Sequence, residues 1–138
     1  MKFIVDSSVI MKWLNITDEE NIEKANALLT DALDGKIDLI APELAKYEIG
    51  NVLLKGKQLT PQEASISFGT AYALPITFIN ETVDLAKETF LIAYNTHITY
   101  YDASFISLAK MYDAILVTEN IKHQGKSSEI KVTSLKDY

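Results

Sequence analysis

The sequence predicts an α/β fold in which helices cover both faces of a mostly parallel central sheet. Short apolar segments with strand character alternate with longer segments of helical spacing along the whole 138-residue chain. Strands that are short and apolar throughout are typical of parallel sheets buried on both faces. With 48% apolar residues and no repeat, low-complexity tract or linker, residues 1–138 are expected to form one domain.

The chain begins with one predicted strand and two predicted helices. Residues 2–5 (KFIV) have strand character and end at Asp6, and SSVIMKWLN continues as a helix. Residues 17–20 have the capping-box pattern of a second helix, which Gly35 is expected to end. The apolar residues of this second helix recur at helical spacing: Ile22, Ala25, Leu28, Leu29 and Leu33.

The middle of the chain is predicted to contain one strand and two helices. Residues 37–41 (IDLIA) have strand character, and Pro42 suits the first turn of a helix that runs to Gly56. Residues 60–63 (TPQE) combine a capping box with proline at the first helical position. Another helix is therefore expected from there to about residue 73.

Three strands and two helices complete the predicted fold. Residues 75–79 (PITFI) form a strand candidate, and a helix is expected over 80–95. A further helix covers 102–112, followed by the strand candidate 114–118 (AILVT). The segment IKVTSL at 130–135 is a weaker strand candidate.

The composition excludes several kinds of functional site. Without cysteine, the chain has no disulfide, thiolate zinc site or cysteine nucleophile. Only His97 and His123 could add nitrogen ligands, so a metal site would use mainly carboxylates and would suit Mg²⁺ or Mn²⁺. No apolar run approaches the roughly 18 residues of a membrane span, and the N-terminus lacks the apolar core of a secretory signal. No membrane contact and a cytoplasmic location are therefore expected.

The charge balance limits how the chain could meet nucleic acid. The formal net charge is −6, and all 13 basic residues are lysines. General binding to nucleic acid needs clustered positive charge, which releases counterions from the phosphates. Any action on nucleic acid is therefore expected to be local or assisted by bound cations.

Glu48 differs from most of the acidic residues, which suit helix caps, first turns or solvated faces. Leu44, Ala45 and Val52 lie four residues before, three before and four after it, which places the carboxylate on an apolar stripe. A buried carboxylate needs a partner. The sequence leaves four possibilities open for the Glu48 carboxylate: it could pair with a lysine, hold a proton, bind a metal ion, or lie at the helix edge and reach solvent.

Two aspartates join Glu48 as candidates. Asp6 lies at the carboxyl end of the first strand, the edge where open α/β sheets form ligand crevices. Asp102 begins the apolar stripe of a predicted helix. Each aspartate alone fits a helix cap or first turn. Taken together, the three acids indicate a divalent-cation site, because clustered carboxylates repel one another unless a cation neutralises them.

At these residues the sequence resembles the PIN-domain family, in particular the small VapC-type ribonuclease toxins of prokaryotic toxin–antitoxin systems. The matching segments are FIVDSSVIMKW, APELAKYEIGNVL, YYDASFISLAK and AILVTEN, in this order and over nearly the whole chain. The resemblance implies a PIN-like parallel sheet sandwiched by helices. It also implies an endoribonuclease site that depends on Mg²⁺ or Mn²⁺.

The resemblance assigns roles to five residues. Asp6 and Asp102 match the metal-binding aspartates of the family, and Glu48 matches its helix-borne glutamate. All three are expected to be catalytic and to bind metal. Ser8 matches a small hydroxyl residue that helps to organise the site, and Asn51 matches a polar residue one turn beyond the glutamate.

The sequence departs from the family pattern after the fourth predicted strand. Thr118, Glu119 and Asn120 stand where many relatives have T-A-D, and His123 stands where T-x-N relatives often have an aspartate. The fourth acidic ligand is therefore left open. Glu119 could turn inward, Asn120 could bind through its amide oxygen, or the second metal could bind weakly.

The expected function is that of a metal-dependent endoribonuclease, the toxin of a type II (VapBC-type) toxin–antitoxin system. The resemblance implies two protein partners, a small VapB-like antitoxin in a helix-lined groove and a second copy in a homodimer. The segment 15–73 carries more apolar residues than one core can bury, which fits such interfaces. The alternative is a catalytically weak PIN domain that binds protein or RNA. A nuclease of DNA or flap structures is less compatible, because such enzymes use extra length to guide DNA.

Overall fold

The central sheet is entirely parallel. The computed structural model describes residues 1–14, 20–119, 121 and 130–138, and within these residues five strands form one sheet. All four neighbouring pairs are parallel, in the order β3-β2-β1-β4-β5. The strands are β1 (Lys2–Val5), β2 (Asp38–Pro42), β3 (Ile76–Ile79), β4 (Ile115–Thr118) and β5 (Val132–Ser134). The predicted α/β fold with a parallel sheet is confirmed.

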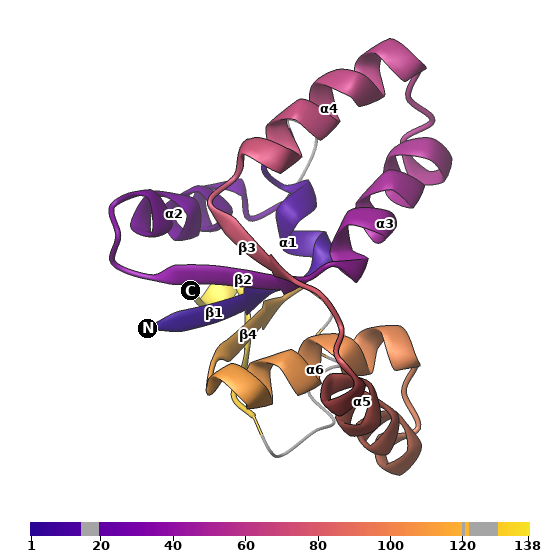
Figure 1. Cartoon of the computed structure of the whole chain (residues 1–138). Helices are drawn as coiled ribbons and strands as arrows, with labels where there is room; N and C mark the ends of the chain where they lie inside the picture. Colours follow the sequence, from indigo (N-terminus) through magenta and orange to yellow (C-terminus); the bar gives the residue numbers. More distant parts are fainter. Residues whose placement is uncertain (15–19, 120, 122–129) are drawn as a thin grey trace.

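Helices cover the two faces of this sheet. Figure 1 shows α1, α2, α3 and α4 on one side of the strands and α5 and α6 on the other. None of the helices in the described part of the chain is long and apolar enough to cross a membrane. Their bounds are α1 (Ser7–Met11), α2 (Ile22–Leu33), α3 (Leu44–Asn51), α4 (Pro61–Ala73), α5 (Val83–Thr96) and α6 (Tyr100–Tyr112), with a π-helical turn at Val52–Gly56 and a 3₁₀ turn at Leu135–Asp137.

The strand order reverses beside β1. From β1 the chain moves outward to β2 and β3, then crosses to β4 on the other side of β1. In open α/β sheets, the carboxyl ends of the strands at such a reversal flank a ligand crevice. The carboxyl ends of β1 and β4, with Asp6 and Glu119 just beyond them, are therefore the expected place for a functional site.

The core lies on both faces of the central strands. The inner strands are almost wholly buried, as the continuous apolar runs of the sequence predicted. Helix α6 packs its apolar stripe against one face, and α1 and α2 pack against the other. The largest fully buried side chains are Ile4, Ile10, Leu28, Leu39, Ile49, Leu53, Phe105, Ile106, Leu108, Leu116 and Leu135.

The C-terminal residue anchors the chain end to the start of the fold. The Tyr138 ring packs edge-on against Phe3 of β1, with 5.7 Å between ring centroids. Its hydroxyl donates to Asp31 of α2, and Lys24 Nζ donates to its carbonyl at 2.9 Å. Burial and the Asp31 carboxylate raise the pKa of Tyr138 to about 12. This contact ties α2 to the end of the chain.

Local signals located most helix ends. Thr60 and Glu63 form both hydrogen bonds of a capping box at the start of α4, at 3.2 and 2.9 Å. Gly35 follows α2 with a φ of +74°, a backbone conformation that glycine adopts at little cost. The capping box predicted at residues 17–19 with Glu20 falls mostly outside the described residues, and α2 begins at Ile22.

The predicted role of Pro42 was wrong. Pro42 is the last residue of β2, where it lies opposite Ile79 of β3, and α3 begins two residues later at Leu44. Pairing with β3 extends the strand by one residue, and the local proline signal does not include that contact. The single helix expected from there to Gly56 also changes to a π-helical turn after Asn51.

Helices α3 and α4 extend away from the sheet as an arm (Figure 1). Several large apolar side chains on this arm face solvent, including Tyr47 at 74% exposed and Tyr72 at 64%. Leu54 and Ile66 are similarly exposed, so the apolar residues of this segment do not all reach the core. Tyr47 and Tyr72 thus lie on the surface, whereas Trp13 is buried and donates from Nε1 to the Ala25 carbonyl at 2.8 Å.

Candidate active site at the carboxyl edge of the sheet

Asp6 lies at the carboxyl end of β1 and is only 6% exposed. It is the N-cap of α1, and its Oδ1 accepts from the Val9 amide at 3.2 Å and from Ser8 Oγ at 2.5 Å. Its Oδ2 accepts from the Thr118 hydroxyl at the end of β4. Burial raises the pKa of Asp6, and the hydrogen bonds from Ser8, Thr118 and the backbone lower it by less. Asp6 therefore caps α1, as the simpler alternative expected, but its burial still makes the charged carboxylate unfavourable.

Glu48 reaches the same edge from helix α3. Its Oε1 accepts a hydrogen bond from Ser7 Oγ at 2.6 Å, across 41 residues of sequence. Burial is the largest cause of a raised Glu48 pKa, the Ser7 hydrogen bond opposes it, and the charges of Asp6 and Asp102 raise the pKa further. The Glu48 carboxylate is therefore subject to the negative charge of both aspartates.

Asp102 belongs to the first turn of α6. The Thr99 hydroxyl caps this helix by accepting from the Asp102 amide at 3.0 Å. Asp102 is half-buried. The helix cap is thus Thr99, which leaves the Asp102 carboxylate available for another partner.

The smaller predicted site residues fall into three groups. Ser8 and Thr118 hold Asp6, and the Glu119 amide donates to Ser8 Oγ at 3.2 Å. Glu119 itself is exposed, with its carboxylate accepting from Asn21 Nδ2 at 3.4 Å. Asn51 is also exposed. Asn120 and His123 lie outside the described residues.

The carboxylates do not form a ready-made metal cage. In residues 1–14, 20–119, 121 and 130–138, no three histidine, aspartate or glutamate side chains are grouped closely enough to hold an ion. The donors at the edge are nevertheless all oxygens, which suit a hard cation. Mg²⁺ commonly keeps several waters and binds through one or two carboxylates plus substrate phosphate. The donor set fits that kind of site.

Ser7 is a site residue that the sequence analysis missed. Its hydroxyl holds Glu48 while Ser8, the next residue, holds Asp6. The signal was present as two consecutive hydroxyl residues directly after the strand-end aspartate. Only one of them was assigned to the site, because the contact with Glu48 depends on how α3 packs against α1.

An all-parallel α/β sheet with acidic side chains at its strand-order reversal is typical of α/β proteins that bind a ligand at this edge of the sheet. The sequence profile of the PIN domain matches residues 3–126, and the chain therefore belongs to the PIN-domain family. No curated protein sequence matches the chain significantly.

Solved structures of similar fold come from toxin–antitoxin systems and related proteins. A chain from the Rickettsia felis VapBC2 complex bound to a promoter DNA fragment is 16% identical, with a TM-score of 0.71, covering 97% of this chain and 98% of that one. PAE2754 from Pyrobaculum aerophilum is 20% identical, with a TM-score of 0.69 and coverage of 99% and 91%. VapC20 of Mycobacterium tuberculosis, a toxin that cleaves the sarcin–ricin loop, is 13% identical, with a TM-score of 0.62 and coverage of 83% and 86%.

Proposed function

We propose that this PIN domain is a metal-dependent endoribonuclease and the toxin component of a type II, VapBC-type toxin–antitoxin system. The observation that carries the proposal is that the adjacent residues Ser7 and Ser8 hold the carboxylates of Glu48 and Asp6 at the strand-order reversal, where the charges of Asp6 and Asp102 raise the pKa of Glu48. Carboxylates that repel one another in this way favour a bound cation. The fold likeness to VapC-type toxins agrees with this reading.

Asp6 and Asp102 are the proposed metal ligands, with Mg²⁺ or Mn²⁺ as the ion, and Glu48 completes the site or orients the attacking water. When bound, such an ion lowers the pKa of a coordinated water and stabilises negative charge on the phosphate oxygens. It also reduces the repulsion between RNA and a chain of net charge −6. Asn120, in place of a fourth acid, contributes at most a neutral amide oxygen.

The surrounding hydroxyls hold the carboxylates in position. Ser8 and Thr118 each donate to one oxygen of Asp6, which limits rotation of its carboxylate. Ser7 does the same for Glu48. The raised pKa of Glu48 brings its carboxyl group closer to the range in which it can accept a proton from water and release it again.

A groove on this chain between α2 and α4 could hold the proposed antitoxin, because it is lined mainly by apolar side chains. Its volume is about 540 Å³, and Leu33 and Ile66 on its rim are 67% and 74% exposed. An amphipathic segment would bury these side chains. We further propose that a basic side chain of the same antitoxin approaches the carboxylates of Asp6, Glu48 and Asp102, which we call the acidic edge. The exposed apolar residues of the α3–α4 arm are proposed to contribute to a homodimer.

RNA cleavage with a matched pair of variants tests the proposed activity. The wild-type chain is expected to cleave single-stranded RNA with Mg²⁺ or Mn²⁺ and to stop when EDTA is added. Asp6→Asn is expected to abolish cleavage, and Asp34→Asn, which removes one charge at the C-cap of α2 before β2 begins, is expected to retain it. Absence of cleavage by the wild type with either ion would favour the alternative of a binding module, and cleavage of DNA alone would contradict the RNA substrate.

Light scattering and co-expression test the partners. A monomer at tens of micromolar protein would refute the homodimer. If no small protein encoded next to this chain suppresses cleavage, the antitoxin proposal fails.

A further inference from the structure

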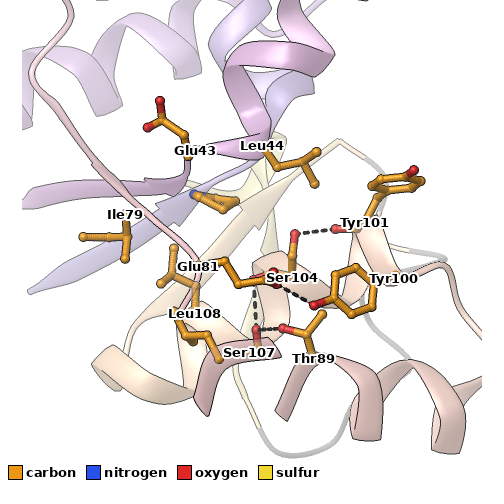
Figure 2. A pocket seen from close by; sticks show the side chains of 12 residues that line it. Glu43, Leu44, Ile79, Glu81, Thr89, Tyr100, Tyr101, Ser104, Ser107 and Leu108 are labelled. Carbon is orange, nitrogen blue, oxygen red and sulfur yellow. Dashed lines mark hydrogen bonds between the residues drawn. The ribbon is translucent and has the colours of Figure 1, made fainter. Parts of the chain in front are cut away.

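A pocket of about 160 Å³ lies beside the acidic edge. It is enclosed by the carboxyl ends of β2 and β3, the start of α3, and the facing sides of α5 and α6 (Figure 2). Drug-sized ligands occupy pockets of roughly 300 Å³ or more, so this one fits a smaller group such as a single ring system. The residues that line it and matter below are Glu43, Leu44, Glu81, Tyr100, Tyr101 and Ser104.

Two helices connect the pocket to the candidate active site. On α6, Tyr101 lines the pocket and directly precedes Asp102. On α3, Leu44 lines the pocket one helical turn before Glu48. A group held in the pocket would therefore lie within a short reach of a phosphate held at the acids.

The walls suit an uncharged, flat ligand. Most of the lining is apolar, and the rings of Tyr100 and Tyr101 stand at the opening, 36% and 59% exposed (Figure 2). Among the described residues that line the pocket none is a lysine; the charged ones are Glu81 and Glu43, and Glu43 forms an ion pair with Lys46 at 2.9 Å. Carboxylates disfavour a phosphate, whereas tyrosine rings stack on nucleobases of any kind. The charge pattern thus favours the base of a nucleotide over its phosphate.

Hydrogen bonds leave one polar group well placed for recognition. At the bottom, Thr89 and Ser107 are fully buried and bond to each other at 2.6 Å, while Ser107 donates to the Ser104 carbonyl. At the rim, the Tyr100 hydroxyl donates to Glu81 Oε1 at 2.6 Å and holds that carboxylate against the pocket (Figure 2). When its carboxyl group is ionised, Glu81 can accept further hydrogen bonds but cannot donate any. It therefore selects a ligand edge that carries N–H donors.

We propose that this pocket binds one nucleobase of a single-stranded RNA, next to the phosphate that is cleaved, and that it prefers guanine. This proposal rests on the proposed nuclease function and adds the specificity of the same site. Proteins read unpaired RNA bases by stacking on aromatic rings and by hydrogen bonds to the base edge. Guanine presents two adjacent N–H donors that a carboxylate can accept together, whereas uracil presents one N–H beside acceptors.

Binding without metal separates this proposal from the nuclease activity. Fluorescein-labelled RNA pentamers UUGUU, UUAUU, UUCUU and UUUUU are titrated with the full chain in EDTA, and fluorescence anisotropy is measured. The pentamer with guanine is expected to bind roughly tenfold more tightly than the one with uracil, as for hydrogen bonds to a charged group. Equal affinities for all four pentamers would overturn the proposal.

Three variants locate the effect. Ser104→Phe fills the pocket and is expected to weaken binding of UUGUU to the level of UUUUU. Glu81→Gln keeps the shape but replaces an acceptor-only group, so the guanine preference is expected to fall by about tenfold. Ser65→Phe, on the exposed surface of α4, is the matched control and is expected to bind as the wild type. Circular dichroism of each variant shows whether it is folded, and a Glu81→Gln chain that keeps the full preference contradicts the assignment even if Ser104→Phe does not fold.

The two proposals fail in different ways. Guanine-dependent binding without RNA cleavage in any metal would refute the nuclease and leave the base pocket standing. Cleavage that needs Asp6 but is unchanged in Ser104→Phe would refute the pocket and leave the nuclease standing. If Ser104→Phe changes the oligomeric state by light scattering without changing RNA affinity, the pocket receives a second copy of the chain, and the nucleobase proposal is wrong.

Discussion

Replacing Asp6 by asparagine tests whether the acidic edge binds a cation, because the exchange changes charge and almost nothing else. The side chain keeps its size, and its carbonyl oxygen can still accept from the Val9 amide and from Ser8. The Thr118 hydroxyl, which now donates to the second carboxylate oxygen, can instead accept from the new amide group. The variant is therefore expected to fold as the wild type does.

The sign of the stability change follows from the raised pKa of Asp6. Burial holds this pKa above its ordinary value near 3.8, so the folded state binds a proton more readily than the unfolded chain. In the metal-free wild type, stability therefore decreases as pH rises from about 3.8 through the raised pKa. The asparagine side chain does not ionise, so above this window Asp6→Asn is expected to be at least as stable as the wild type without metal, within the roughly 1 kcal/mol of one rearranged hydrogen bond.

The size of the metal effect can be worked from the chain length. A domain of 138 residues has an unfolding entropy of about 0.29 kcal/mol/K, so each kcal/mol shifts Tm by about 3.5 °C. A ligand at 100 times its Kd stabilises the folded state by about 2.7 kcal/mol. Saturating Mn²⁺ is thus expected to raise the Tm of the wild type by about 9 °C.

The assay is thermal unfolding followed by circular dichroism at pH 7, over a titration of Mg²⁺ or Mn²⁺ at constant ionic strength. Asp6→Asn is expected to lose most of the metal-induced shift, and Asp34→Asn is expected to show the full shift. A shift in Asp6→Asn equal to that of the wild type would mean that the ion binds elsewhere, and the reasoning about this edge would be wrong. A variant that unfolds at a much lower Tm without metal would contradict the charge argument.

Three further substitutions test other contacts. Ser7→Ala removes the hydrogen bond that lowers the Glu48 pKa, so the acidic limb of the pH profile of RNA cleavage is expected to move to higher pH. If the limb does not move, Glu48 does not transfer a proton during cleavage. The Tyr138 pKa of about 12 means that its contact with Asp31 stabilises the fold below about pH 10 and is lost as pH rises to about 12. Between pH 9 and 11, the Tm of Tyr138→Phe is therefore expected to decrease less than the Tm of the wild type. Thr60→Ala removes the cap of α4 and is expected to cost about 1 kcal/mol in urea unfolding with RNA cleavage unchanged, whereas a loss of cleavage would connect the arm to the active site.

The local pattern of the sequence was sufficient for most of the fold. Buried strands appear as short apolar runs, and caps such as Thr60 have a signature of a few residues, so these elements could be located without tertiary contacts. The error at Pro42 occurred because a distant segment intervened: Pro42 joined β2 because β3 lies beside it. The exposed Tyr47 and Tyr72 agree with the excess of apolar residues expected in segment 15–73, because the arm of α3 and α4 extends away from the sheet.

The site divides in the same way. Asp6, Glu48 and Asp102 could be selected from sequence because their positions, at a strand end and on apolar helical stripes, were costly for a carboxylate without a partner. Ser7 could not be assigned to Glu48, since 41 residues separate them and only the packing of α3 against α1 joins their side chains. That Asp6, Glu48 and Asp102 bind a metal ion together stays a prediction.

The sequence by itself determined where most strands and helices form and which acids lack a simple local role, because each depends on residues close together along the chain. It also determined the membership of the PIN family, because the residue pattern over 3–126 can be matched without knowing any contact. Only the tertiary structure decided that β4 lies next to β1, which brings Thr118 to Asp6 across 112 residues. It also decided that α3 and α6 enclose a pocket beside those acids. Strand order and helix packing follow from how the whole chain buries its apolar surface, and that global balance is not written in any local pattern.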